Sequence, residues 1–255
     1  MSKQRRKQST SLRAVQWKRF LRAPDAQLLD ELYAPALSRA VRYDRCCAYF
    51  SSRVLSVAAR GFGGFIQNLL TFGDEVPKPA ARLLVNEQLD PGDLSALLAS
   101  GDASQLIEKL LKQFVTPKDA LEKNRLEMLA WLVASGWLEV RVGLMRHTRG
   151  LSHAKFGIIT DIHGDSLAFM GSDNETGQAL IENYEEIEVR PSWQDKEFAD
   201  YYHERFETLW ADKDESVTTL PLPDAVKLKL IQFAPKEPPE EVRQDKAALA
   251  TAMLW

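Results

Sequence analysis

Short apolar runs, separated by longer segments with helical spacing, constrain the fold of this chain more than any other feature. The run Cys46 to Phe50 (CCAYF) is continuously apolar, which is typical of a strand buried on both faces of a sheet. Ala81 to Val85 has a similar character and predicts a second strand. A strand that is buried on both faces needs helices on both sides of its sheet. The pattern therefore predicts an α/β fold.

Helical spacing of apolar residues separates the predicted strands. We expect helices over residues 25–37, 54–70, 91–99, 104–114, 117–135 and 197–210. We expect further strands over residues 138–144, 153–160, 166–170 and 186–190. Strands and helices thus alternate in the first half of the chain, and strands cluster in the second. This order predicts a largely buried mixed sheet flanked by helices, an α/β/α sandwich.

The two ends of the chain differ in composition from its middle. Residues 1–22 carry basic side chains and no acid, so we expect a basic N-terminal arm, either simply solvated or adding phosphate affinity. Residues 213–255 are expected to form a proline-containing linker and the start of a following domain, with residues 23–212 as the main domain. The apolar stretch 247–255 fits either that following domain or a terminal helix docked on the main one.

The cysteines and the lack of targeting signals predict a reduced, cytoplasmic protein. Cys46 and Cys47 are adjacent, and neighbours on an extended strand point to opposite faces, so we expect no disulfide between them. No apolar run follows the basic start, as a signal peptide would require. No stretch reaches the length of a transmembrane helix, so no membrane partner is expected.

The segment 153–186 contains the side chains that best suit catalysis. His153 and Lys155 lie two apart on a predicted strand, so both emerge on one face. The turn Gly171-Ser172-Asp173-Asn174 follows the next strand, and Asn183 and Glu185 open the one after it. Each of these residues alone has an ordinary structural explanation. Their order and spacing together favour a site at converging strand ends, able to bind a phosphate and attack it.

Phosphate chemistry gives each predicted site residue a role. His153 would be the nucleophile, and Lys155 and Asn174 would donate hydrogen bonds to the phosphate oxygens. Ser172 would bind substrate beside them, and Glu185 would orient the imidazole ring. The histidines lack ligand spacing and the carboxylates do not cluster, so we expect neither a metal nor another cofactor.

The order of these submotifs resembles that of the phospholipase D superfamily, which carries His-x-Lys, an Asp, Gly-Ser-x-Asn and then Asn-x-Glu. The resemblance covers residues 42–210. It implies a phospholipase D-like fold and catalysis by histidine. The position of the motif aspartate differs, since Thr160 stands where the family has Asp, and Asp161 follows one residue later. In the family that aspartate is mainly structural, so the difference concerns the fold more than the reaction.

Within the superfamily, the chain is similar to nuclease-like domains attached to bacterial helicases of restriction and phage-defence systems. Residues 171–176 (GSDNET), residues 182–185 (ENYE) and Ser192-Trp193 carry this likeness. It implies a nuclease that acts on nucleic acid, with DNA favoured over RNA. It also implies a helicase, either fused to this domain or acting as its partner.

The resemblance further implies a homodimer. Superfamily sites contain two His-x-Lys motifs: one histidine attacks phosphorus, and the other protonates the leaving oxygen. This chain has one such motif, because His147 and His203 lack the lysine. A second copy related by a two-fold axis would complete the site. Two alternatives stay open: a catalytically silent nucleic-acid-binding or dimerisation module of a helicase, and a phospholipase or phosphatidyl transferase, which the single motif disfavours.

Overall fold

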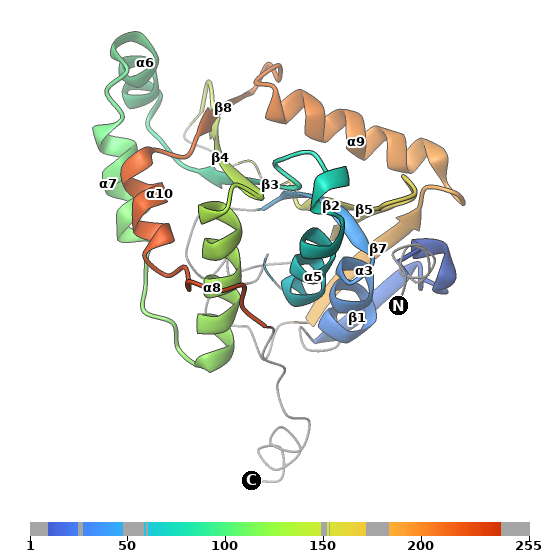
Figure 1. Cartoon of the computed structure of the whole chain (residues 1–255). Helices are drawn as coiled ribbons and strands as arrows, with labels where there is room; N and C mark the ends of the chain where they lie inside the picture. The colour runs from blue at the N-terminus through green and yellow to red at the C-terminus, as the bar shows by residue number, and fades with distance from the viewer. Residues whose placement is uncertain are drawn as a thin grey trace, which may run out of the picture.

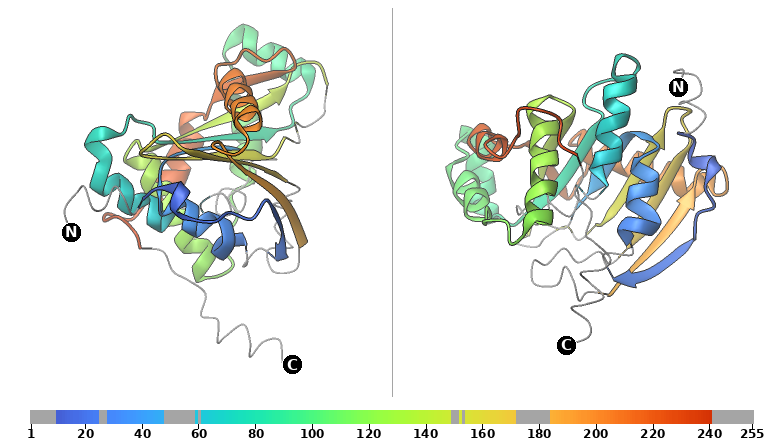
Figure 2. Two further views of the ribbon diagram at one scale, coloured as in Figure 1. Left: turned by 90° about the vertical axis from the view of Figure 1, so that its right-hand side faces the viewer. Right: turned by 60° about the horizontal axis from the view of Figure 1, so that its bottom comes forward.

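A mixed eight-stranded sheet, in the order β1-β7-β6-β5-β2-β3-β4-β8, forms the centre of the protein. The structure is a computed structural model that describes residues 10–24, 28–47, 59, 61–148, 152, 154–171 and 184–240. Helices cover both faces of the sheet (Figure 1 and Figure 2). The α/β/α sandwich predicted from the sequence is therefore confirmed.

The middle of the sheet is parallel and its flanks are antiparallel. Strands β2, β3 and β4 are parallel neighbours, whereas β5, β6 and β7 form an antiparallel meander beside β2. Parallel neighbours need long crossovers, so helices separate β2, β3 and β4, while a short turn joins β5 to β6. The strands are β1 (Phe20–Pro24), β2 (Ala40–Cys46), β3 (Ala81–Glu87), β4 (Leu138–Met145), β5 (Phe156–Asp161), β6 (Ser166–Gly171), β7 (Tyr184–Pro191) and β8 (Val217–Pro221).

Helices α3, α5 and α8 pack on one face of the sheet, and α9 lies across the other (Figure 2). The larger hydrophobic core lies on the α5 and α8 side, and a smaller cluster containing Phe156, Phe206 and Trp210 lies under α9. The helices are η1 (Leu12–Ala14), η2 (Leu29–Tyr33), α3 (Ala34–Leu37), α5 (Phe62–Phe72), η3 (Gly73–Glu75), α6 (Pro91–Ser100), α7 (Ser104–Lys112), α8 (Ala120–Ala134), α9 (Lys196–Trp210) and α10 (Asp224–Ile231). None of these described helices is long and apolar enough to cross a bilayer.

Helix α8 begins later than its sequence predicts. The sequence predicted a helix from residue 117, but the structure has Asp119 as the N-cap, with its carboxylate accepting the Glu122 amide at 2.8 Å. The Glu122 side chain in turn accepts the Lys118 amide at 2.7 Å. This reciprocal pair satisfies two amides at the helix start, so it outweighs the preference of Pro117 for a first turn. The predicted end at residue 135 is confirmed to within one residue: α8 ends at Ala134, and Gly136 follows with a left-handed φ of 73°.

Strand β2 starts earlier than the apolar run that predicted it. It covers Ala40–Cys46, while residues 48–50 lie outside the described residues. No clear strand signal precedes Cys46, because Arg42, Asp44 and Arg45 interrupt the apolar pattern. Cys46 and Cys47 pack in the two different cores, on opposite faces, and do not form a disulfide, as predicted.

Both chain ends contribute more to the domain than their composition suggested. The expected arm 1–22 is folded where it is described: Leu12 is buried, and β1 pairs with β7. The expected linker from residue 213 contains β8 and α10, whose Val226 and Leu230 join the larger core. The sequence reading missed this because a few apolar residues among bases or prolines carry little periodic signal. Residues 1–9 and 241–255 lie outside the described part of the chain.

The basic residues of the described N-terminal segment are engaged in ion pairs. Their partners are acids from elsewhere in the chain: Arg13 with Asp165, Lys18 with Glu31, Arg19 with Glu188 and Arg22 with Glu186. This part of the predicted arm therefore presents less net positive charge than its sequence suggests.

Candidate active site

The strand ends at which the sequence predicted a site lie together along one edge of the sheet. We call it the site edge: β2 and β6 end there, and β5 and β7 begin there. Phe156, the first residue of β5, pairs with both Cys46 of β2 and Met170 of β6. The Gly171 amide donates to the Lys155 carbonyl at 3.3 Å. The backbone thus brings Lys155 directly beside the start of the Gly-Ser-x-Asn segment.

The structure describes part of the predicted site. Lys155 is half-buried immediately before β5, and the Glu185 backbone lies in β7, opposite Ala23 of β1. The Glu185 side chain is not described. His153, Ser172, Asn174 and Asn183 lie outside the described residues. The strands that flank them share the site edge, and the convergence of their side chains stays a prediction.

Gly171 has a structural reason to be glycine. A Cβ at this position would overlap the Glu186 carbonyl oxygen and lie 2.9 Å from the Ile187 Cα. Since those atoms belong to the backbone of β7, only a residue without a side chain lets β6 and β7 approach here. The glycine of Gly-Ser-x-Asn therefore serves strand pairing at the site edge.

Asp161 holds the opposite end of β5 together. Its buried carboxylate accepts amide hydrogen bonds from Leu12 and His163, each at 2.8 Å, and from Asp165 at 3.1 Å. The first joins the N-terminal segment to the sheet, and the other two close the turn between β5 and β6. Asp161, one residue later than the family aspartate, therefore has a structural function far along the strand from Lys155.

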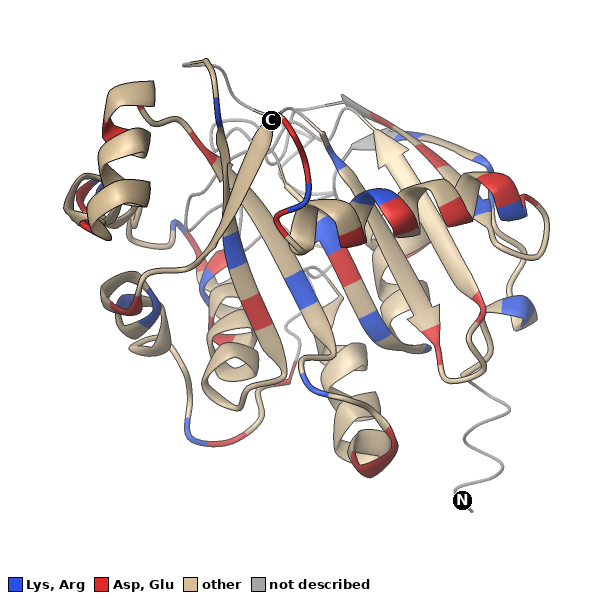
Figure 3. Cartoon of the chain, turned by 90° about the horizontal axis from the view of Figure 1, so that it is seen from above, with Lys and Arg blue, Asp and Glu red and all other residues tan. Residues whose placement is uncertain are grey.

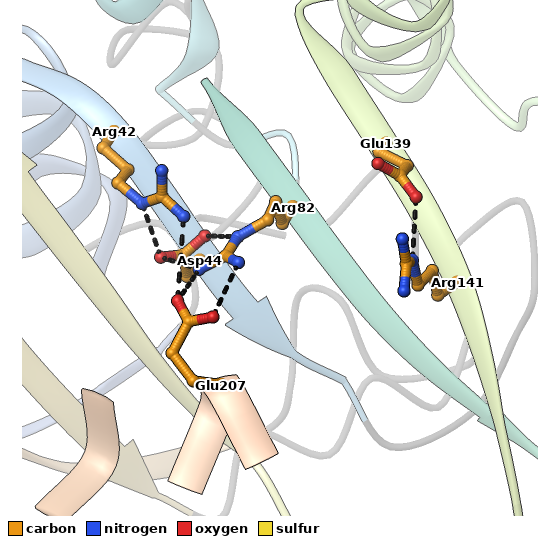
Figure 4. Close-up of polar contacts among 6 residues, drawn as sticks. All are labelled: Arg42, Asp44, Arg82, Glu139, Arg141 and Glu207. Atoms are coloured by element: carbon orange, nitrogen blue, oxygen red, sulfur yellow. Dashed lines mark hydrogen bonds and ion pairs between the residues drawn. The ribbon is translucent and has the colours of Figure 1, made fainter. Parts of the chain in front are cut away.

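An ion-pair network under α9 joins β2, β3 and α9 (Figure 4). The nearly buried Arg82 donates to Asp44 at 2.6 and 2.9 Å and also to Glu207. Arg42 donates to the same Asp44 at 3.0 Å. Although burial opposes its charge, the hydrogen bonds with Asp44 and Glu207 raise the pKa of Arg82 above its ordinary value. Through this network, the charged side chains of Arg42, Asp44 and Arg82 on the sheet each have a partner of opposite charge.

Arg82 also contacts two aromatic side chains of α9 and so helps to hold this helix on the sheet. Its guanidinium lies 4.8 Å from the ring centre of Phe206 and 5.3 Å from that of Trp210, while Arg141 lies 4.4 Å from Trp210. Cations over aromatic faces are favourable, particularly where water is excluded. Sequence reasoning missed this network. The sequence feature that could have indicated it is the pair Arg42 and Asp44, two residues apart in a segment that also contains apolar residues.

Two polar residues at the end of β3 were also missed. Asn86 is buried, and its Nδ2 donates to the Cys47 carbonyl at 2.6 Å, which fixes the chain where it leaves β2. Burial raises the pKa of the neighbouring Glu87, whose carboxylate accepts the Gln88 amide. The sequence shows them only as the polar end of an apolar run, a weak signal.

Comparison with known proteins identifies the family. Residues 82–210, just over half of the chain, match the family model described as "Cardiolipin synthase, PLD-like domain". The chain therefore belongs to this phospholipase D-like family, and the predicted superfamily membership is confirmed. The family places it among phospholipase D-type hydrolases and transferases of phosphodiesters.

Comparison with solved structures finds a likeness to NucT from Helicobacter pylori. The sequences are 13% identical, the TM-score is 0.40, and the match covers 79% of this chain and 97% of that one. No curated protein matches the sequence.

Proposed function

We propose that this protein is a metal-independent nuclease that cleaves nucleic acid through a phosphohistidine intermediate. The observation that carries the proposal is the site edge, where the Lys155 carbonyl accepts the Gly171 amide. It supports the proposal because Lys155 of His-x-Lys and Gly171 of Gly-Ser-x-Asn then lie at adjacent strand ends, in a chain of the phospholipase D-like family. The Glu185 backbone lies in β7, the next strand beyond β6.

The proposed reaction has two displacements at phosphorus. A nitrogen of the His153 imidazole attacks phosphorus, and the bond to the leaving oxygen breaks as a second histidine gives that oxygen a proton. Lys155, Asn174 and Ser172 donate to the non-bridging oxygens, which gain charge in the transition state. Water, deprotonated by the second histidine, then cleaves the phosphorus–nitrogen bond and leaves a phosphomonoester. Glu185 accepts from the other ring nitrogen and stabilises the imidazolium.

The second histidine comes, in this proposal, from a second copy of the chain. A two-fold homodimer would place the two His153 side chains on either side of one phosphate. One imidazole must be neutral while the other is charged, so activity would show a bell-shaped pH profile.

The cellular setting is proposed on the resemblance alone. The GSDNET and ENYE segments and Ser192-Trp193 support a cytoplasmic, bacterial restriction or phage-defence protein that acts on DNA with a fused or partner helicase. A silent binding module of such a helicase is the alternative. A lipid substrate is a second candidate, because the matching family model is described by cardiolipin synthase.

One set of incubations tests these functions. The wild-type chain is incubated in EDTA with labelled DNA, labelled RNA and phosphatidylcholine vesicles. We expect nucleic-acid cleavage, with at least about a thousandfold loss in His153→Ala and Lys155→Ala, since each removes a group that acts on the phosphate. His163→Ala is the matched control, because this exposed histidine lies in the turn at the other end of β5.

The outcomes separate the candidate functions. Cleavage by His153→Ala at the wild-type rate, or its loss in EDTA, would refute the phosphohistidine mechanism. Binding without cleavage would identify the silent module, and turnover of the vesicle lipid would identify a phospholipase.

A further inference from the structure

Large side chains beside the site edge are exposed to solvent. Tyr201 of α9 is 60% exposed, and Met170, the penultimate residue of β6, is 39% exposed. Between them lies Tyr202, whose hydroxyl donates to the Met170 sulfur at 2.8 Å. Exposed large apolar side chains that lie together on a protein surface often mark a binding surface.

The direction of Tyr201 follows from the way α9 crosses the sheet (Figure 3). Tyr202 contacts Met170 at the site-edge end of β6, whereas Nε2 of His203 lies 3.4 Å from the hydroxyl of Ser166 at the opposite end. Successive residues of an α-helix are turned by about 100°. Because Tyr201 precedes Tyr202 and His203 follows it, Tyr201 projects from the exposed side of α9 and is displaced toward the site edge relative to His203.

Aromatic contacts connect this surface to the strand that carries Lys155. The rings of Tyr201 and Tyr202 meet edge to face at 5.1 Å, and those of Tyr202 and Phe156 lie 4.9 Å apart. Phe156 directly follows Lys155 in the chain. A base held against Tyr201 would therefore belong to a nucleotide close to the phosphate at Lys155.

The charges of α9 decide which part of a nucleic acid it can contact. Lys196 is paired with Asp200, and Arg205 is paired with Asp214. Both basic side chains of α9 therefore already have an acidic partner in place of a phosphate. The helix also carries the acids Glu197 and Glu204, which would repel a phosphate. This surface is thus suited to an uncharged base and unsuited to a phosphate backbone.

We propose that Tyr201, Tyr202 and Met170 form a stacking platform for an unpaired base, and that the substrate is single-stranded nucleic acid. The inference rests on the nuclease function proposed above. In a duplex the base faces are covered by their neighbours, and a base must leave the stack before it can contact a side chain. A duplex would also bring its second backbone toward the acids of α9.

Binding to fluorescent oligonucleotides tests the platform in the full chain. With cleavage blocked by His153→Ala, we expect Tyr201→Ala to weaken binding of a twelve-nucleotide single strand about tenfold, the effect of losing one stacked base. Tyr201→Phe should restore it, because the ring face is kept. Leu228→Ala, which truncates another exposed side chain on α10, is the matched control and should bind as the parent does.

An abasic oligonucleotide tests whether the lost contact is a base. One base is removed at successive positions around the cleaved bond. At one position, we expect removal of the base to weaken binding to the His153→Ala parent about tenfold. Removal of the same base should not weaken binding further when the protein also carries Tyr201→Ala. In cleavage by the otherwise wild-type chain, Tyr201→Ala should raise KM for the single strand by a similar factor.

Several results would overturn the platform while leaving the nuclease in place. They are unchanged single-strand binding in Tyr201→Ala, an equal loss for a duplex of the same length, and additive effects of the abasic position. A wild-type chain that neither binds nor cleaves nucleic acid would instead overturn the nuclease and the platform together. Loss of binding to phosphatidylglycerol vesicles in Tyr201→Ala, with DNA binding unchanged, would identify a lipid-binding surface.

Discussion

Replacing the buried Asp44 by asparagine should destabilise the protein more than replacing Glu207, the exposed acid of the network under α9. The Asp44 side chain is 2% exposed and accepts two hydrogen bonds from Arg82 and one from Arg42. Asparagine keeps the shape but loses the charge and one acceptor oxygen. Removing one partner of a buried ion pair typically costs about 3–5 kcal/mol.

The loss of stability in Asp44→Asn should lie near the lower end of that range, because Arg82 keeps other contacts. Arg82 keeps Glu207 as a partner, and the amide oxygen of the new asparagine would still accept one bond, so we expect about 3 kcal/mol. For a chain of this size that corresponds to a decrease in melting temperature of about 6–12 °C. Glu207→Gln should cost only about 1 kcal/mol, because the Glu207 side chain is 57% exposed and its pairing is screened by water.

Urea unfolding followed by circular dichroism measures both variants against the wild type. Glu139→Gln is the control, since Glu139 forms a separate ion pair within β4, with the partly exposed Arg141 (Figure 4). If Asp44→Asn lost no more stability than Glu207→Gln, burial would not determine the strength of these pairs and the reasoning would be refuted.

Three further predictions concern pH, assembly and the N-terminus. Burial lowers the pKa of His203 below its ordinary value of 6.5, despite Asp44, Glu207 and Asp200 nearby, with Arg42 also lowering it. The stability that neutral His203 contributes is therefore present above about pH 6.5 and lost as pH falls through the folded pKa. His203→Gln should therefore weaken the pH dependence of the unfolding free energy below about pH 6.5. Light scattering should show a homodimer, and a fully active monomer at nanomolar concentration would contradict the shared site. Deleting residues 1–8 should weaken DNA binding about tenfold and reduce its salt dependence. If the binding constant kept the same dependence on salt concentration, the basic side chains of this segment would have no role in DNA binding.

Local signals in the sequence were enough to predict the fold class, the site-edge strands β5, β6 and β7, and the family. Apolar runs and helical spacing are local signals, and Lys155, Gly171 and Glu185 lie in or next to the consecutive strands β5, β6 and β7. Consecutive strands usually pair, so the neighbourhood of Lys155 and Gly171 could be inferred without coordinates.

Features that depend on partners far apart in the chain emerged only from the folded structure. Leu12 and Asp161 are 149 residues apart, and Arg82 and Glu207 are 125 residues apart, yet each pair is hydrogen-bonded. No spacing rule connects such residues, so β1, β8, the network under α9 and the direction of Tyr201 could not be predicted. A buried charge or an edge strand is stable only when its partner is in place, and that partner is chosen by the packing of the whole sheet.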